Sequence, residues 1–403
     1  MDRFSFLNAA HTEFFAQLYD QYLENPDSVE PSWRSFFQGF DFGMTTYNQE
    51  NLAQQVTSNV STGQVSEKVL KEFNVLKLID AYRTRGHLFT ETNPVRERRN
   101  YTPTLDIENF NLSSADLNTV FDAAKILGHQ PKSLQEIISH LKNVYCQHIG
   151  IEYMYIRKPE VVQWIQDKLN INDNLPNFNS DQKKIILGKL NDAVSFENFL
   201  HTKYVGQKRF SLEGGESIIP ALDALIEAAA DKGVEHFVMG MAHRGRLNIL
   251  ANIFHKSTQD IFSEFDGKDY DKEYFDGDVK YHLGLTSEKT TRSGKKININ
   301  LAPNPSHLET VGAVIEGITR AKQDKYFPNN FSKVLPIAVH GDAAVAGQGI
   351  VYEIVQMAQL DGYKTGGTIH LVINNQVAPF EQFHKQYLVR PQQHRRELQL
   401  VKL

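Results

Sequence analysis

The sequence predicts an α/β protein in which a helical N-terminal region precedes a doubly wound parallel sheet. Two observations lead to this fold class. Residues 67–206 carry apolar side chains mostly at helical spacing, and from residue 207 short apolar runs alternate with amphipathic stretches. Such alternation is typical of a parallel sheet covered by helices. We therefore divide the chain into five segments: 1–43, 44–66, 67–206, 207–377 and 378–403.

The overall composition narrows the class of protein. The chain has 403 residues, 41% of them hydrophobic and 23% charged, and its net charge is −5. This length predicts two or three domains, and the charge balance argues against nucleic-acid binding. The single cysteine, Cys146, excludes a disulfide framework. The sequence shows no signal peptide, mitochondrial presequence or membrane span, so we expect a cytoplasmic protein of bacterial type.

The segments before the sheet differ in their expected roles. Residues 1–43 are too few to build their own core, so we expect a docking segment whose aromatic residues pack either on this chain or on a partner. Residues 44–66 are polar and nearly uncharged, which predicts a linker. Residues 67–206 are expected to be mainly helical, with Pro159 as the first residue of one helix.

Five apolar runs in residues 207–377 predict strands. The strand candidates are 236–241, 279–284, 296–303, 334–341 and 368–375, and the helix candidates are 216–232, 306–324 and 348–360. In doubly wound sheets ligands bind beyond the carboxyl ends of the strands. The polar or small segments AHRGR, HLG, NPSHLE, GDAAVAGQG and NNQV, which end or follow these runs, are therefore the candidate site loops.

Two of these loops carry oxygen ligands at corresponding positions. Asp342 follows one strand candidate and Asn374-Asn375 end the next, with thirty-one residues between Asp342 and Asn374. This is enough for one helix and a return strand, so Asp342 and Asn375 are expected at the same edge of the sheet. A carboxylate and an amide oxygen suit magnesium, which completes its shell with waters and phosphate oxygens. Gly347 and Gly349 precede a helix and could present N–H groups to an anion.

Several other interpretations of these residues compete. The glycines lack the third member of a dinucleotide fingerprint and the Lys-Ser/Thr of a phosphate loop. A histidine zinc site is disfavoured, because no cysteine or acidic partner recurs at ligand spacing. Taken alone, Asp342 would more often be a turn or cap residue, and His243 and His282 would more often be structural. Three further histidines are expected beside the site or as packed polar residues: His307, His340 and His370.

Taken together, the motifs resemble a thiamine-diphosphate enzyme family. FSLEGGESIIPALD, GMAHRGRLNIL, DVKYHLG, NPSHLE, HGDAAVAGQG and INNQV occur in this order, and LYDQYLENPDSVEPSWRSFF lies near the N-terminus. They are similar to the first, decarboxylating component of the 2-oxoglutarate dehydrogenase complex. The resemblance covers about residues 5–377. It implies that residues 207–377 form the diphosphate-binding α/β domain of that family.

The resemblance also implies cofactors and site residues. The implied cofactors are thiamine diphosphate and magnesium. The implied metal ligands are Asp342, Asn375 and the main-chain carbonyl of Val377. The implied cofactor-binding residues are Arg244, Ser306, Leu308, Asp342, Ala343, Ala344 and Asn375. The implied catalytic residues, which face the substrate, are His243, His282 and Ser306. A guanidinium suits phosphate oxygens, and imidazoles can donate hydrogen bonds to a 2-oxo dicarboxylate.

The activity implied by the family is oxidative decarboxylation of 2-oxoglutarate in the tricarboxylic acid cycle. The succinyl group would pass to a lipoyl group on a second component, the lipoyl-bearing succinyltransferase. The other implied partners are a second copy in a homodimer and the small 2-oxo dicarboxylate, with no nucleic acid and no membrane.

The resemblance ends after Val377. Residues 378–403 are expected to form a divergent basic tail, weakly helical or partly disordered. The pyrimidine-binding half and its activating glutamate are not recognised, so we expect a truncated chain that is inactive or nearly so alone. A non-catalytic fragment and a 2-oxoadipate dehydrogenase are the alternatives.

Overall fold

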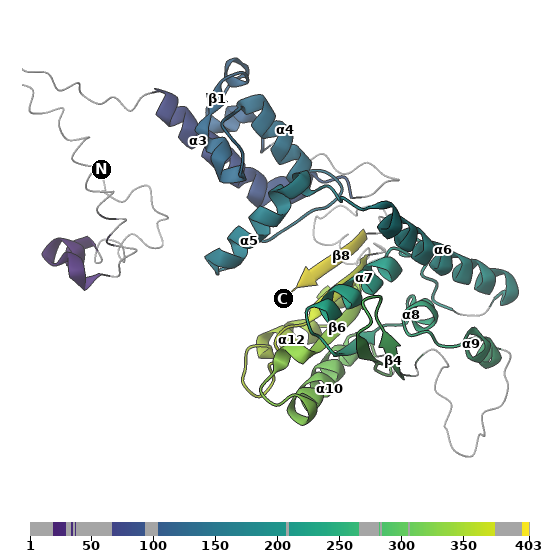
Figure 1. Cartoon of the computed structure of the whole chain (residues 1–403). Helices are drawn as coiled ribbons and strands as arrows, with labels where there is room; N and C mark the ends of the chain where they lie inside the picture. The colour runs from purple at the N-terminus through teal and green to yellow at the C-terminus, as the bar shows by residue number, and fades with distance from the viewer. Residues whose placement is uncertain are drawn as a thin grey trace, which may run out of the picture.

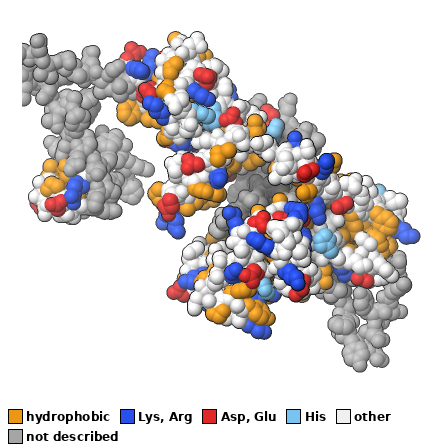
Figure 2. Space-filling view, in the orientation of Figure 1, with side chains coloured by type: hydrophobic (Ala, Val, Ile, Leu, Met, Phe, Trp, Pro, Cys, Tyr) orange, Lys and Arg blue, Asp and Glu red, His pale blue; other side chains and the backbone are white. Residues whose placement is uncertain are grey.

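The computed structural model divides the molecule into a helical part and a sheet part (Figure 1). It describes residues 19–29, 34, 37, 67–92, 104–206, 209–265, 282, 284–304, 307–374 and 397–402. Within these residues, no helix has both the length and the apolar character needed to cross a membrane. Basic and acidic side chains are interspersed over the face seen in Figure 2, in keeping with the small net charge of −5.

The helical part confirms the helices predicted in residues 67–206. Its helices are α3 (Glu67–Arg85), α4 (Leu134–Tyr145), α5 (Pro159–Asn170) and α6 (Ser180–Lys203). Its short elements are η3 (Gly86–Phe89), η4 (Ile107–Phe110), η5 (Ser114–Asp116), β1 (Val120–Phe121), η6 (Asp122–Leu127), β2 (Lys132–Ser133) and η7 (Ile171–Asn174). Ser133 and Glu136 form a capping box at the start of α4, and Pro159 begins α5.

The two larger hydrophobic cores among the described residues lie on either side of residue 180 in the sequence. The first joins α3, α4 and α5 through fully buried side chains such as Leu78, Ile137 and Leu141. The second lies under the sheet, and α6 contributes Ala193 and Leu200 to it. The core of the α/β part therefore begins within α6, before residue 207. The proposed domain boundaries themselves stay a prediction.

Three aromatic residues of the N-terminal segment pack on one another. Tyr19, Tyr22 and Phe37 are each less than 10% exposed, and their ring centroids lie 5.2–6.1 Å apart. The short turn η1 (Pro26–Ser28) lies between them in sequence. Residues 38–66, which include the predicted linker, lie outside the described part of the chain.

The sheet has six strands in the order β4-β5-β3-β6-β7-β8. Their bounds are β3 (His236–Met241), β4 (Leu285–Thr290), β5 (Lys296–Leu301), β6 (Val334–Gly341), β7 (Ile369–Asn374) and β8 (Glu397–Lys402). β3 pairs in parallel with β5 and β6, and β6 pairs in parallel with β7. The connecting elements are α7 (Ile218–Asp231), α8 (Arg246–Asn252), α9 (Thr258–Phe265), α10 (Thr310–Tyr326), η9 (Phe331–Lys333), α11 (Asp342–Gly347) and α12 (Ile350–Met357). The predicted fold class is confirmed.

The two edge strands differ from the prediction. Both are antiparallel to their neighbours, and neither was predicted. The strand predicted at 279–284 lies mostly outside the described residues. Of its two described residues, His282 lies in a short helical turn and Gly284 has no regular structure. The strand β4 begins only at Leu285. The tail was expected to be helical or disordered, which is wrong for residues 397–402: they form β8. Pairing with β8 satisfies backbone groups along β7 that an edge strand would leave open.

Side chains alternate between the two faces of the sheet. Phe237, Met239 and Met241 of β3 point into the core that α6, α7 and α8 cover. Val238 points to the opposite face, where α10 packs on β3 and β6. Gly240 lies beneath α10, and a Cβ there would be 2.8 Å from Cγ2 of Ile315. Glycine at this position therefore permits the close approach of helix and sheet.

Candidate active site

The carboxyl ends of β3, β5, β6 and β7 meet along one edge of the sheet, as predicted. β5 lies on one side of β3 and β6 on the other, so the chain reverses its direction across the sheet between β3 and β6. Ligands of doubly wound sheets bind at such a switch point. In the register of β6 and β7, Gly341 lies opposite Ile373, so the next positions are Asp342 and Asn374.

Asp342 is the first residue of α11, immediately beyond the end of β6. Its side chain is half-buried, and no donor among the described residues reaches its carboxylate. Ala343 and Ala344 follow in the same turn, and Ala344 is 8% exposed. A carboxylate that has no partner in the described part of the chain, at the end of a central strand, is available to a cation. Three predicted site residues lie outside the described part of the chain: Ser306, Asn375 and Val377.

His243 and Arg244 follow β3 at the same edge. The imidazole of His243 lies 4.0 Å, centroid to centroid, from the ring of Phe210. Burial, and then the charges of Arg244 and His282, lower the pKa of His243. Nη1 of Arg244 donates to the carbonyl oxygen of Ser211 at 3.2 Å. The segment around residue 211 is therefore part of the wall of the site.

Arg246 joins the other strand ends, a role that sequence reasoning missed. Its side chain is fully buried and donates to the carbonyl oxygens of Met241 (3.3 Å), Ala302 (2.7 Å) and His282 (3.5 Å). Burial lowers the pKa of Arg246 to about 10. His282 is itself only 2% exposed. The guanidinium thus holds His282 against the ends of β3 and β5.

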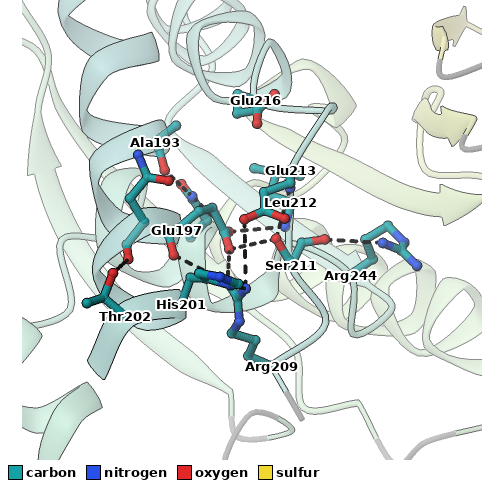
Figure 3. A network of polar contacts seen from close by, with 12 residues as sticks. Ala193, Glu197, His201, Thr202, Arg209, Ser211, Leu212, Glu213, Glu216 and Arg244 are labelled. Carbon is teal, nitrogen blue, oxygen red and sulfur yellow. Dashed lines mark hydrogen bonds and ion pairs between the residues drawn. The ribbon is translucent and has the colours of Figure 1, made fainter. Parts of the chain in front are cut away.

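A second buried charge, Glu197 of α6, fixes the segment that carries Ser211 (Figure 3). Its carboxylate accepts hydrogen bonds from Ser211 Oγ (2.9 Å), from the Leu212 backbone N–H (3.1 Å) and from Asn248 Nδ2 (3.1 Å). Arg209 completes the network at 3.3 Å. Glu197 is 3% exposed. Sequence reasoning missed Glu197 because it precedes its partners by 12 to 51 residues.

Behind the edge, Glu309, His340 and His370 form a buried polar chain. Nδ1 of His340 lies 2.5 Å from Oε2 of Glu309, and Nε2 lies 2.8 Å from Nδ1 of His370. Burial, and then His340, lower the pKa of His370 to about 4. His340 and His370 are packed polar residues, one of the two predicted possibilities, whereas His307 is exposed and its predicted place beside the site stays a prediction.

Two more residues line the loop after β5. Leu308, a predicted cofactor contact, is half-buried in the turn that leads into α10. Asn304 was not predicted. Its side chain is 1% exposed, and neither amide atom has a hydrogen-bond partner among the described residues. A buried unsatisfied amide costs stability, so Asn304 is a candidate for bonding a ligand.

The fold and this edge define the class of protein: an α/β protein with a ligand site at the switch point of its sheet. Comparison with known families identifies the family. Residues 189–387 match the family described as "Dehydrogenase E1 component", and residues 4–44 match "2-oxoglutarate dehydrogenase N-terminus". The chain belongs to the dehydrogenase E1 component family and corresponds to the N-terminal part of its 2-oxoglutarate dehydrogenase members. The predicted resemblance is confirmed.

Individual relatives agree with this assignment. The chain is 42% identical over 390 residues to the 2-oxoglutarate dehydrogenase E1 component of Cupriavidus necator, and 41% identical over 389 residues to that of Azotobacter vinelandii. These alignments cover 93% and 92% of this chain, but 41% and 40% of the relatives. It is 44% identical over 330 residues to the "Multifunctional 2-oxoglutarate metabolism enzyme" of Mycolicibacterium vanbaalenii, covering 79% of this chain and 26% of that protein.

The family is thiamine-diphosphate-dependent, and the residues at this edge fit that cofactor. Asp342 offers a carboxylate without a described donor, and Arg244 brings a guanidinium to the neighbouring strand end. A carboxylate suits the metal ion and a guanidinium suits the phosphate oxygens of a metal–diphosphate unit.

Proposed function

We propose that the carboxyl edge of β3, β6 and β7 binds thiamine diphosphate with a magnesium ion. We further propose that the chain serves oxidative decarboxylation of 2-oxoglutarate in the tricarboxylic acid cycle. One observation carries the proposal: Asp342 stands half-buried at the switch point without a described partner. The names of the relatives support the choice of 2-oxoglutarate.

In the proposed complex, Asp342, Asn375 and the carbonyl of Val377 hold the magnesium ion. Arg244 pairs with the diphosphate. The remaining cofactor contacts come from Ser306, Leu308, Ala343 and Ala344. When bound, the cofactor supplies a carbanion nucleophile and an electron sink for the loss of carbon dioxide.

The proposed substrate-facing residues are His243, His282 and Ser306. Burial, and then the charges of Arg244 and His282, lower the pKa of His243, which favours the neutral imidazole, a form that can accept or donate a proton beside the bound 2-oxo acid. His282 is held in place through Arg246. No described residue can be assigned to activate the aminopyrimidine, so we expect little turnover by the chain alone.

The proposed partners follow from the same activity. The acyl acceptor is a lipoyl group on a succinyltransferase component, and the proposed assembly contains two copies of the E1 component. The proposed location is the bacterial cytoplasm, which the bacterial relatives support.

The test measures carbon dioxide release from carboxyl-labelled 2-oxoglutarate and 2-oxoadipate, with thiamine diphosphate and magnesium, alongside cofactor binding. We expect cofactor binding that Asp342→Ala abolishes, and at most slow decarboxylation that favours 2-oxoglutarate. Turnover at the rate of a complete enzyme would refute the need for further activating groups. Preference for 2-oxoadipate would refute the proposed substrate.

A further inference from the structure

A cluster of metal-binding side chains lies in the helical part, outside the proposed active site. His129 follows the turn after η6, His140 lies on α4, and Asp173 lies in η7. One ligand atom from each lies within 4.8 Å of the others. His140 is 5% exposed, and the other two are partly buried. Three potential ligands from three separate elements therefore converge on one point.

The contacts around His140 indicate what could occupy this point. Nδ1 of His140 lies 3.4 Å from Nε2 of His129 and 2.6 Å from Oδ1 of Asp173. A single N–H on Nδ1 can be directed at only one of these acceptors. A cation at the centre would be bound by all three, with neutral imidazole and carboxylate as ligands.

Two of the three separations are close to those around a small transition-metal ion, and the third, between His129 and Asp173, lies within 4.8 Å and would shorten on binding. With bonds of about 2.0–2.2 Å, two ligands of a tetrahedral zinc ion lie roughly 3.3 Å apart. The separation of the two histidine nitrogens, 3.4 Å, already matches this value. The carboxylate oxygen, at 2.6 Å from His140, would move outward by about 0.7 Å on binding. Its side chain is 39% exposed, so there is room for that movement.

The surroundings also hold the proposed ligands in orientation. Nε2 of His140 lies 3.2 Å from Oδ1 of Asn170, so in the metal-bound form its N–H would donate there while the deprotonated Nδ1 binds the ion. Metal-bound histidines characteristically use their second nitrogen in this way. Asn172, Asp173 and Asn174 all have positive φ (56°, 52° and 56°), and from this turn the carboxylate of Asp173 contacts His140. Asn174 fixes the turn by donating to the carbonyl oxygen of Val144 at 3.0 Å.

We propose that His129, His140 and Asp173 bind one divalent transition-metal ion of the zinc class, linking η6, α4 and η7. Two imidazoles and one carboxylate favour zinc or cobalt over magnesium, which prefers oxygen ligands alone. The fourth position would be taken by water. The ligands are 11 and 33 residues apart, so no compact sequence motif reveals the site. The site is independent of the proposed thiamine diphosphate site.

The test uses the full chain without an affinity tag, stripped of metal by a chelator. Cobalt is added while visible absorption is recorded, and zinc and magnesium binding are measured by calorimetry. We expect one cobalt ion per chain with the strong visible bands of a tetrahedral complex. We also expect zinc to raise the melting temperature, whereas magnesium does not bind at this site.

The variants His129→Gln and Asp173→Asn should each weaken zinc binding by more than the roughly 10–100-fold that loss of an outer-shell partner causes, because each removes a ligand. Asparagine tolerates positive φ, so Asp173→Asn keeps the backbone conformation. Asn170→Ala should weaken binding by about 10–100-fold. His148→Gln, in the same part of the chain, is the control and should bind as the parent does. Circular dichroism confirms folding of each variant.

Two results would overturn the proposal. One is a parent chain that binds no zinc at micromolar concentration. The other is folded His129→Gln and Asp173→Asn chains that bind cobalt with the stoichiometry and spectrum of the parent.

Discussion

Replacing Glu197 with alanine should destabilise the sheet part strongly, because its carboxylate is buried and accepts four hydrogen bonds. Without it, the Leu212 backbone N–H, in a residue that is 1% exposed, loses its acceptor, at a cost of about 1–3 kcal/mol. Asn248 keeps its bond to the Ala193 carbonyl oxygen and loses less. Arg209 loses a buried partner, and breaking such a pair typically costs about 3–5 kcal/mol. Because Arg209 keeps Glu213 as a second carboxylate partner at 3.7 Å, its loss falls below that range, and we expect a total loss of about 3–5 kcal/mol in the free energy of unfolding.

The assay is urea unfolding followed by far-ultraviolet circular dichroism, with equal slopes required for the comparison. Glu197→Gln retains one acceptor oxygen and should lose only about 1–3 kcal/mol. Glu213→Ala is the matched control: this carboxylate is 49% exposed and lies 3.7 Å from the same Arg209, so its loss should cost less than about 1 kcal/mol. If Glu197→Ala were no more damaging than Glu213→Ala, the buried network would not stabilise this segment.

Three further predictions follow from other parts of the sheet. The pKa of His370 is about 4 in the folded state, below the unfolded value near 6.5. The neutral side chain therefore contributes fully to the free energy of unfolding above pH 6.5, and this contribution is lost as the pH falls toward 4. The free energy of unfolding should drop by about 3 kcal/mol between pH 6.5 and pH 4, and His370→Gln should remove most of that drop. If the free energy of unfolding of the variant depended on pH as steeply as that of the parent, the prediction would be wrong. Gly240→Ala should destabilise the fold by about 1–3 kcal/mol, because the added Cβ would meet α10. Gly317→Ala, where the added Cβ would have no atom within 4 Å, should stabilise the fold by about 0.5–1 kcal/mol. Both effects are measured by thermal unfolding, and equal effects would refute the packing argument. Asn304→Ala should change the free energy of unfolding by less than about 1 kcal/mol yet weaken thiamine diphosphate binding, and a normal dissociation constant would exclude Asn304 from the site.

The central strands were predictable because their signal is local. β3, β6 and β7 are buried runs whose predicted bounds differ from the observed ones by one residue at most. β4 was missed because its burial alternates and its sequence, LTSEKT, is largely polar, so its place depends on pairing with β5. β8 likewise forms through its pairing with β7.

The candidate site was only partly predictable for a similar reason. Asp342 was found because a motif places it directly after a strand. Glu197 and Arg246 act through neighbours that are distant in sequence, as in the separation of 56 positions between Arg246 and Ala302, and Asn304 is marked only by its burial without a side-chain partner. Such contacts exist only in the folded chain, and no local pattern marks them.

The central claim is that Asp342 holds a magnesium–diphosphate group at the switch point of the sheet. Titration of the full chain with thiamine diphosphate in a calorimeter, with and without magnesium, tests it most directly. The account predicts binding that requires magnesium and that Asp342→Ala abolishes, while Asp361→Ala, a change to an exposed carboxylate, leaves it intact. Equal affinity in the parent and in Asp342→Ala, or binding that does not depend on magnesium, would contradict it.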